Sequence, residues 1–247
     1  AAPTVTTDAA SSITKTTATL NGTITSDGGA FATDGGFEYG TSVSYTSTGG
    51  AISYEYNSQF GSAGTGAGQF SIPQNIVIDS SGNMYVTDQF RHRVQKFDSS
   101  GAFVSMFGWG VETGASQFET CTSTCQAGVA GSGDGQFNRP YGIDIDSTGN
   151  IYVTDGQNRR VQKFNSSGAF VSMFGWGVDT GASAFETCTS GCQIGLSGSG
   201  DGQFSSAGIA GIALDSSDNI YVVDANNRRI QKFNSSGAFV SMFGWGV

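Results

Sequence analysis

The chain repeats one pattern of apolar and polar positions three times. The clearest copy covers residues 135–175 and reads GQFNRPYGIDIDSTGNIYVTDGQNRRVQKFNSSGAFVSMFG. Equivalent stretches begin at Gly68 and Gly202, so successive copies are 67 residues apart, and the third copy has two extra residues within 208–211. Self-similarity at a fixed period indicates an architecture built from repeated structural units.

Within each copy, four short segments have the composition of β-strands, because apolar residues alternate with polar ones along them. In the second copy these segments are residues 142–146, 150–154, 160–164 and 169–174. Turn residues such as Asp146-Ser147-Thr148-Gly149 separate them. Each copy is therefore predicted to form a sheet of four antiparallel strands, as in the blade of a β-propeller.

The residues shared by the copies, GQF…GI.ID..GN.YV.D..N.R.QKF...G, resemble the NHL repeat, a blade unit of β-propellers. The resemblance covers residues 68–107, 135–174 and 202–243. The first copy departs from the others at two places: it has Arg91-His92-Arg93 where they have Asn-Arg-Arg, and Gln74 where the second has Tyr141-Gly142. The resemblance implies a propeller that is open or incomplete with three blades, unless further chain or partners complete it.

Residues 1–50 differ in composition and contain strand patterns at residues 3–7, 16–24 and 36–40. The run from Ser12 to Thr23, followed by GGFEYGTS, resembles the opening of a bacterial fibronectin type III-like domain. We therefore predict an all-β fold in which a partial β-sandwich, residues 1–50, precedes NHL-like blades in residues 51–247. A further strand at 52–56 leads to Phe60-Gly61, which matches Phe107-Gly108 of the main repeat, so we expect the chain to enter the propeller through a lone last strand.

Two insertions, residues 108–134 and 175–201, separate the blades, and each contains a pair of cysteines. The pairs are Cys121 with Cys125 and Cys188 with Cys192. Loops of this length tend to be functional or cross-linked. We expect one disulfide within each insertion; a disulfide between neighbouring insertions and a zinc site made by both pairs are the alternatives.

Acidic and basic residues recur at fixed places in each blade. The pairs are Asp88 with Arg93, Asp155 with Arg160, and Asp224 with Arg229. Each pair flanks the turn between the second and third strands, so a charge-assisted hydrogen bond is expected to fix that turn. The alternative is a basic patch for RNA, built from Arg159-Arg160 and Arg228-Arg229.

Two further sets of residues are candidates for surface roles. Trp109, Trp176 and Trp245 follow the last strand of each blade and are interpreted as blade packing or as stacking and interface residues. Asn21, Asn165 and Asn234 match the N-x-S/T pattern for glycosylation.

Composition argues against a nucleic-acid partner and against membrane insertion, and it indicates where the protein is located. Acidic residues outnumber basic ones 20 to 11 and the net charge is −9, so no nucleic-acid partner is expected. No apolar stretch approaches the roughly 18 residues needed to cross a bilayer, so no membrane insertion is expected. The even cysteine count and the low charge predict an extracellular or cell-surface location. The opening Ala1-Ala2-Pro3 fits a terminus left by a peptidase that cuts after small residues.

Candidate catalytic chemistry is sparse. The single histidine, His92, has no counterpart in the other copies, although the lyases among NHL-like propellers are expected to carry histidines around a central metal. Asp144 and Asp146 share one strand face, where a calcium or strand-edge role is as reasonable as catalysis. We therefore predict no catalytic or metal-binding residues, no cofactor and no enzyme activity.

The leading functional hypothesis is a secreted or cell-surface structural protein that self-assembles as a filament subunit. Self-association is expected through the blades and through the N-terminal strand at residues 3–7, followed by a flexible link at 8–12, which would add to a neighbouring subunit. The alternatives are a ligand-binding propeller that recognises carbohydrate or protein, and a propeller enzyme of the lyase or hydrolase type.

Overall fold

The computed structural model describes residues 59–206 and 208–244 and, before them, the backbones of four strands. The chain divides into two compact units, Ala1–Ser58 and Gln59–Val247. In the first unit β1 (Thr4–Ser11) pairs antiparallel with β2 (Thr19–Ser26). The strand β3 (Ser42–Ser47) pairs in the same way with β4 (Gly50–Glu55). The fibronectin-like character of this unit stays a prediction.

Two expectations for the first unit are corrected. The link predicted at residues 8–12 is wrong as far as Ser11, because β1 continues to that residue and pairs there with Thr19 of β2. Pairing with a neighbouring strand outweighs the low strand propensity of Asp and Ala. The strand predicted at 52–56 is present as β4, but it forms a hairpin with β3 instead of entering the propeller. The strand predicted at 36–40 lies outside the described residues.

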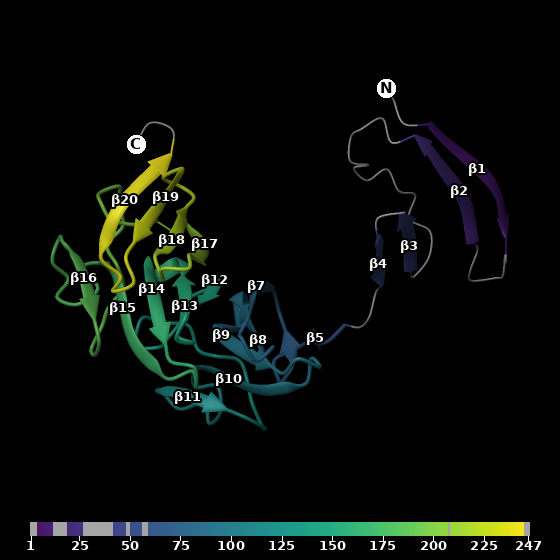
Figure 1. Ribbon diagram of the computed structural model, residues 1–247. Coiled ribbons are helices and arrows are strands. Elements are labelled where there is room, and N and C mark those ends of the chain that lie inside the picture. The colour runs from purple at the N-terminus through teal and green to yellow at the C-terminus, as the bar shows by residue number, and fades with distance from the viewer. Residues whose placement is uncertain are drawn as a thin grey trace. The chain divides into compact units, whose positions relative to one another are not determined.

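Three large sheets and one two-stranded sheet make up the described part of the second unit, and the large sheets run from blue through green to yellow in Figure 1. Each large sheet contains one repeat of four antiparallel strands, and these repeats are here called blades 1, 2 and 3. Blade 1 consists of β7 (Pro73–Ile78), β8 (Met84–Asp88), β9 (Arg93–Phe97) and β10 (Phe103–Trp109). Blade 2 consists of β12 (Pro140–Ile145), β13 (Ile151–Asp155), β14 (Arg160–Phe164) and β15 (Phe170–Trp176). Blade 3 consists of β17 (Ile209–Leu214), β18 (Ile220–Asp224), β19 (Arg229–Phe233) and β20 (Phe239–Gly244).

The innermost strands place the blades side by side. The strand β12 of blade 2 contacts β7 of blade 1 and β17 of blade 3. This arrangement confirms the predicted all-β fold with an open series of propeller blades.

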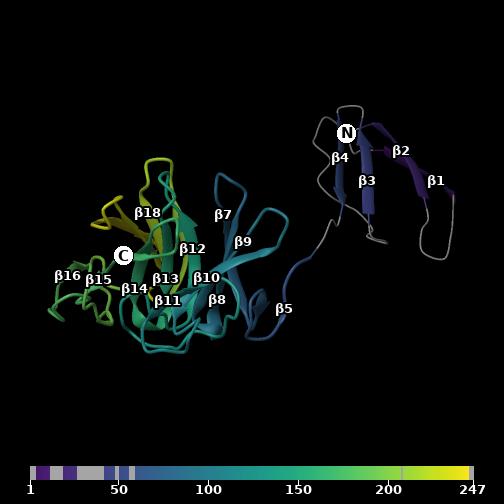
Figure 2. The same ribbon diagram turned by 90° about the horizontal axis from the view of Figure 1, so that it is seen from below.

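The insertions add a feature that the repeat pattern does not predict. β11 (Phe118–Cys121) and β16 (Phe185–Cys188) pair antiparallel with the last strands of blades 1 and 2, so these two sheets have five strands. Figure 2 shows β16 at the outer edge of its sheet. The added strands cover an edge that would otherwise present unpaired backbone groups.

Apolar side chains join each blade to the next. The cluster between blades 1 and 2 includes Tyr85, Val94 and Phe107 on one side and Ile143, Val153 and Phe164 on the other. The ring centroids of Phe107 and Phe164 are 4.9 Å apart, and those of the equivalent Phe174 and Phe233 are 5.0 Å apart. Burial of this apolar surface is the main favourable contribution to holding the blades together.

Phe60 takes the same place on the outer side of blade 1. Its ring centroid lies 4.9 Å from that of Phe97, the equivalent of Phe164. Two short parallel strands follow it, β5 (Ser62–Ala63) and β6 (Gln69–Phe70). The match of Phe60-Gly61 to Phe107-Gly108 therefore reflects equivalent packing of the two phenylalanines.

Candidate ligand-binding site

Buried ion pairs fix the turn between the second and third strands of each blade. Asp155 Oδ2 lies 3.0 Å from Arg160 Nε, and both side chains are fully buried. The pairs Asp88 with Arg93 and Asp224 with Arg229 have the same arrangement at 3.3 and 3.0 Å. The other carboxylate oxygen of Asp155 accepts the backbone N–H of Asn138, which leads into β12. These arginines are thus structural and are not available to a ligand.

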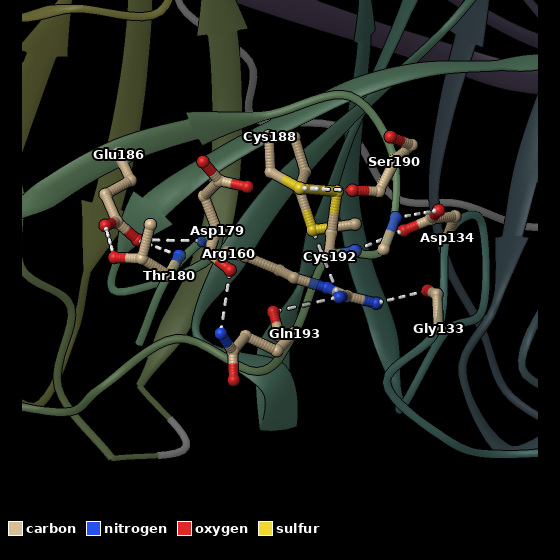
Figure 3. Close-up of a disulfide and its surroundings, with 12 residues drawn as sticks. Gly133, Asp134, Arg160, Asp179, Thr180, Glu186, Cys188, Ser190, Cys192 and Gln193 are labelled. Carbon is tan, nitrogen blue, oxygen red and sulfur yellow. Dashed lines mark hydrogen bonds between the residues drawn. A yellow bond between two sulfur atoms is a disulfide. The ribbon is translucent and has the colours of Figure 1, made fainter. Parts of the chain in front are cut away.

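Each of these arginines also donates hydrogen bonds to the segments that precede and follow its blade, as Figure 3 shows for Arg160. Its guanidinium donates to the carbonyl oxygens of Ser132, Gly133 and Gln136 before β12. It also donates to the carbonyl of Gln193 in the insertion that follows. Burial opposes a charged Arg160 and lowers its pKa, while the Asp155 carboxylate acts in the opposite direction.

Each insertion contains its own disulfide. Cys121 is bonded to Cys125 and Cys188 to Cys192. Asp134 accepts the backbone N–H groups of Gly191 and Cys192 at 2.8 and 2.9 Å, which anchors the second disulfide loop (Figure 3). Among the described residues, no group of three or more His, Cys, Asp or Glu side chains is placed to hold a metal ion.

The tryptophans and asparagines singled out in the sequence lie in local structural positions. Trp109 is half-buried against Gly133, and Trp176 donates a hydrogen bond of 3.4 Å to Ser183. Trp245 lies outside the described residues. Asn165 Oδ1 accepts the backbone N–H groups of Ser167 and Ala169, and Asn234 is placed equivalently. Asn21 lies in β2, and glycosylation of all three stays a prediction.

Asp144 and Asp146 have different hydrogen-bond partners and different structural roles. Asp144 accepts the backbone N–H of Leu214 at 2.6 Å and so links blade 2 to blade 3. Asp146 caps its own turn through Thr148 and Asn150. Burial alone would raise the pKa of Asp146, but the hydrogen bonds from Asn150 and Thr148 outweigh it and hold the pKa at about 2.

A pocket opens where the turns of all three blades meet. Its volume is about 270 Å³. Turn residues and the starts of inner strands line it; among them, Gln89 comes from blade 1, Arg139, Tyr141 and Gln157 from blade 2, and Asn226 from blade 3. Gln89 belongs to a short 3-10 helix, η1 (Gln89–Arg91), and Gln157 to η2 (Gly156–Asn158). The pocket is therefore assembled from residues far apart in sequence.

The polar groups of blade 2 in this pocket are free to meet a ligand. Among the residues that the structure describes, the Arg139 guanidinium and the Tyr141 hydroxyl have no hydrogen-bond partner. The Arg139 guanidinium carbon lies 4.9 Å from the centre of the Phe90 ring of blade 1. The backbone N–H of Arg139 donates to Nδ1 of His92, also of blade 1, at 3.2 Å. Blade 1 thus positions the arginine that blade 2 presents.

The pocket is lined at positions where the three near-identical copies differ. After the buried aspartate the copies read Gln-Phe-Arg-His, Gly-Gln-Asn-Arg and Ala-Asn-Asn-Arg, whereas the strands on either side are nearly unchanged. At the start of the inner strand, Arg139 and Tyr141 occur only in the second copy. The residues that line the pocket therefore differ between copies, whereas the second and third strands of the blades hardly do.

One buried residue type with a structural role escaped the sequence analysis. Gln95, Gln162 and Gln231 are fully buried. Gln162 accepts the backbone N–H of Gly135 and donates to the carbonyl of Gln136, so it fixes the start of its blade. The signal was present, because the Gln-Lys-Phe triplet recurs unchanged in all three copies.

Comparison with known proteins agrees with this architecture. A family model of the NHL repeat matches residues 137–164 and 207–233. Protein brain tumor of Drosophila melanogaster is 29% identical over 147 residues, which cover 49% of this chain and 14% of that protein. A probable peptidyl-alpha-hydroxyglycine alpha-amidating lyase of Caenorhabditis elegans is 30% identical over 104 residues, covering 42% of this chain and 25% of that protein. The chain thus carries NHL repeats, arranged as propeller blades.

Solved structures resemble the chain at low identity. A streptogramin B lyase structure has a TM-score of 0.40 and 14% identity, and the match covers 83% of this chain and 48% of that one. The chain therefore spans about half of that structure and a quarter or less of the two relatives named above.

These relatives correct the functional expectations. The prediction that the chain is not an enzyme is contradicted, because proteins that share its repeats include an amidating lyase. The comparisons also favour the binding and enzyme functions over the filament subunit that the sequence analysis placed first. Within the described residues, no helix has the length and apolar character to span a bilayer.

Proposed function

We propose that the three blades form part of an extracellular propeller that binds an acidic carbohydrate in the pocket around Arg139. The observation that carries this proposal is the unpaired Arg139 guanidinium beside the exposed ring of Tyr141. A guanidinium recognises a carboxylate through two parallel hydrogen bonds, and an aromatic ring with a polar edge suits the apolar face of a sugar. The two disulfides support a location outside the reducing cytosol.

Charge distribution supports an anionic ligand in spite of the net charge of −9. Buried aspartates form ion pairs with Arg93, Arg160 and Arg229, so these arginines are not available to a ligand. Lys96, Lys163 and Lys232 lie over tyrosine rings. Of the other described arginines, Arg139 lines the pocket, whereas Arg159 donates to the carbonyl oxygens of Gly195 and Gln157. At physiological salt, charges farther away than about one Debye length are largely screened, so an anion in the pocket would interact mainly with the Arg139 guanidinium.

The proposal is tested with an oligogalacturonate and its methyl ester, in which the carboxylates are converted to neutral esters on the same sugar chain. Nuclear magnetic resonance spectra of the labelled chain should show shifts at the amides of Gly156 and Gly208 on adding the acid. The ester should cause little change. Equal shifts with both ligands, or shifts confined to other residues, would refute recognition of the carboxylate in this pocket.

A lyase activity is the second candidate, favoured by the 30% identity to the amidating lyase. A peptide ending in alpha-hydroxyglycine also presents a carboxylate, which suits Arg139. Mass spectrometry of such a peptide incubated with the chain tests this candidate, and formation of the amidated peptide above the buffer rate is the expected result. No product above that rate would exclude it for this chain.

A further inference from the structure

The outer faces of the three-blade unit repeat the two sides of its internal interfaces. We call the side that a blade turns to the following blade its leading face, and the opposite side its trailing face. The leading face of blade 3 carries Tyr221, Ile230 and Phe243, which are equivalent to Tyr85, Val94 and Phe107 of blade 1. The trailing face of blade 1 carries Phe70, Ile76 and Val86, which are equivalent to Phe137, Ile143 and Val153 of blade 2.

Both outer faces expose residues that the internal interfaces bury. Phe243 is 51% exposed, whereas its equivalent Phe174 is 4% exposed. Ile76 is 48% exposed, whereas its equivalent Ile143 is 3% exposed. These are two complementary apolar surfaces, since the same residue types fit each other twice within the chain.

The trailing face of blade 1 also contains a hollow of about 290 Å³. Its lining includes Phe60, Phe70, Ile76 and Val86. In the internal interface the equivalents of Ile76 and Val86 pack against Tyr85 and Val94. The hollow therefore lies where a tyrosine and a branched aliphatic side chain of a preceding blade would pack.

Phe60 occupies the remaining part of this site. It packs on Phe97 as Phe107 packs on Phe164, with ring centroids 4.9 Å apart in both pairs. A Cβ added to Gly101 would lie 3.0 Å from Phe60, just as one added to the equivalent Gly168 would lie 2.7 Å from Phe107. Phe60 is thus a local substitute for the phenylalanine of a preceding blade.

We propose that the leading face of blade 3 binds the trailing face of blade 1 in a second copy of this chain, with Phe243 replacing Phe60. Tyr221 and Ile230 would then enter the hollow. The contact joins two different surfaces, so it either closes a ring of copies or continues as an open chain. This proposal is independent of ligand binding in the Arg139 pocket.

One departure from the repeat makes this contact weaker than the internal ones. The hydroxyl of Thr154 donates to the carbonyl of Ala210 in the next blade at 2.7 Å, and Thr87 donates to Tyr141 in the same way. Blade 3 has Val223 at this position and cannot make the bond. The contact between copies therefore lacks one hydrogen bond that the internal interfaces have, and it competes with Phe60.

Sedimentation velocity of the whole 247-residue chain over a range of concentrations tests the proposal. The expected result is association that increases with concentration. Phe243→Ala should weaken it at least about tenfold, as expected for an aromatic residue at the centre of an interface. Val240→Ala is the matched control, because Val240 is 52% exposed and its equivalent Val171 remains 40% exposed in blade 2, which has a neighbouring blade on both sides.

Two further variants should act in the opposite direction. Phe60→Ala should strengthen association, because it removes the competitor. Val223→Thr should strengthen it as well, since it restores the hydrogen-bond donor of the internal interfaces; circular dichroism verifies that every variant is folded. A chain that is monomeric at every concentration would overturn the proposal, as would equal effects of the Phe243 and Val240 substitutions.

Discussion

The Nδ1 atom of His92 accepts the backbone N–H of Arg139 at 3.2 Å, and this bond joins blade 1 to blade 2 beside the pocket. Both residues have left-handed backbone conformations, with φ of 49° at His92 and 61° at Arg139. Only an unprotonated ring nitrogen can accept a hydrogen bond. The neutral form of His92 therefore holds Arg139 in place.

The stability of the chain should depend on pH through His92. Burial lowers the pKa of His92, Arg139 lowers it further, the Asp88 carboxylate raises it, and Arg91 lowers it. Because the folded-state pKa lies below the unfolded value of about 6.5, this interaction is fully present above about pH 6.5. It is lost as the pH falls through the folded-state pKa.

His92→Asn provides the matched control for this dependence. Asparagine tolerates the left-handed conformation and offers an acceptor oxygen that does not titrate. Urea unfolding between about pH 7 and pH 5 should show a steeper loss of stability in the parent than in the variant. Equal slopes would contradict the role assigned to His92.

Loss of the buried aspartate should strongly destabilise a blade. Asp155→Ala leaves Arg160 charged, fully buried and without its carboxylate partner. Such a change lowers the free energy of unfolding by about 3–5 kcal/mol. The control is Asp201→Ala, because Asp201 is exposed and its removal should change stability by no more than about 0.5 kcal/mol. Denaturant unfolding that gives similar values for both variants would refute the buried ion pair.

The within-loop disulfides should contribute modestly to stability. Cys188 and Cys192 are four positions apart, so their bond restricts only a short loop of the unfolded chain. The chain-entropy relation gives about 2 kcal/mol for a loop of this size. Replacing both cysteines by serine should lower the free energy of unfolding by about that amount, with Thr189→Ala as the control. Free thiols in the native parent protein, detected by alkylation and peptide mapping, would contradict the bond itself.

The repeat made much of this fold predictable. Strand positions follow from local alternation of apolar and polar residues, and the pair of Asp155 and Arg160 spans a single turn. Such features depend on residues close in sequence, and the same local pattern occurs in all three near-identical copies. The fifth strand at Phe185–Cys188 was missed because its few residues lie in an insertion and acquire strand structure by pairing with the edge of β15.

The pocket was not predictable for a different reason. Gln89, Arg139 and Asn226 come from three separate copies and meet only because the blades pack side by side. The first and second copies have different residues at these positions. A sequence difference between copies does not show which of these residues lie together in the folded chain. The tertiary arrangement turns scattered differences between repeats into one site.

The central claim is that Arg139 recognises the carboxylate of an acidic carbohydrate, and calorimetric titration with an oligogalacturonate tests it most directly. Arg228→Ala is the matched control, because Arg228 is exposed, has a left-handed φ of 55° and does not line the pocket. The parent and Arg228→Ala should bind with similar affinity, and Arg139→Ala should bind at least about tenfold more weakly after losing its charge-assisted hydrogen bonds. Unchanged affinity in Arg139→Ala, or no binding by the parent, would contradict the claim.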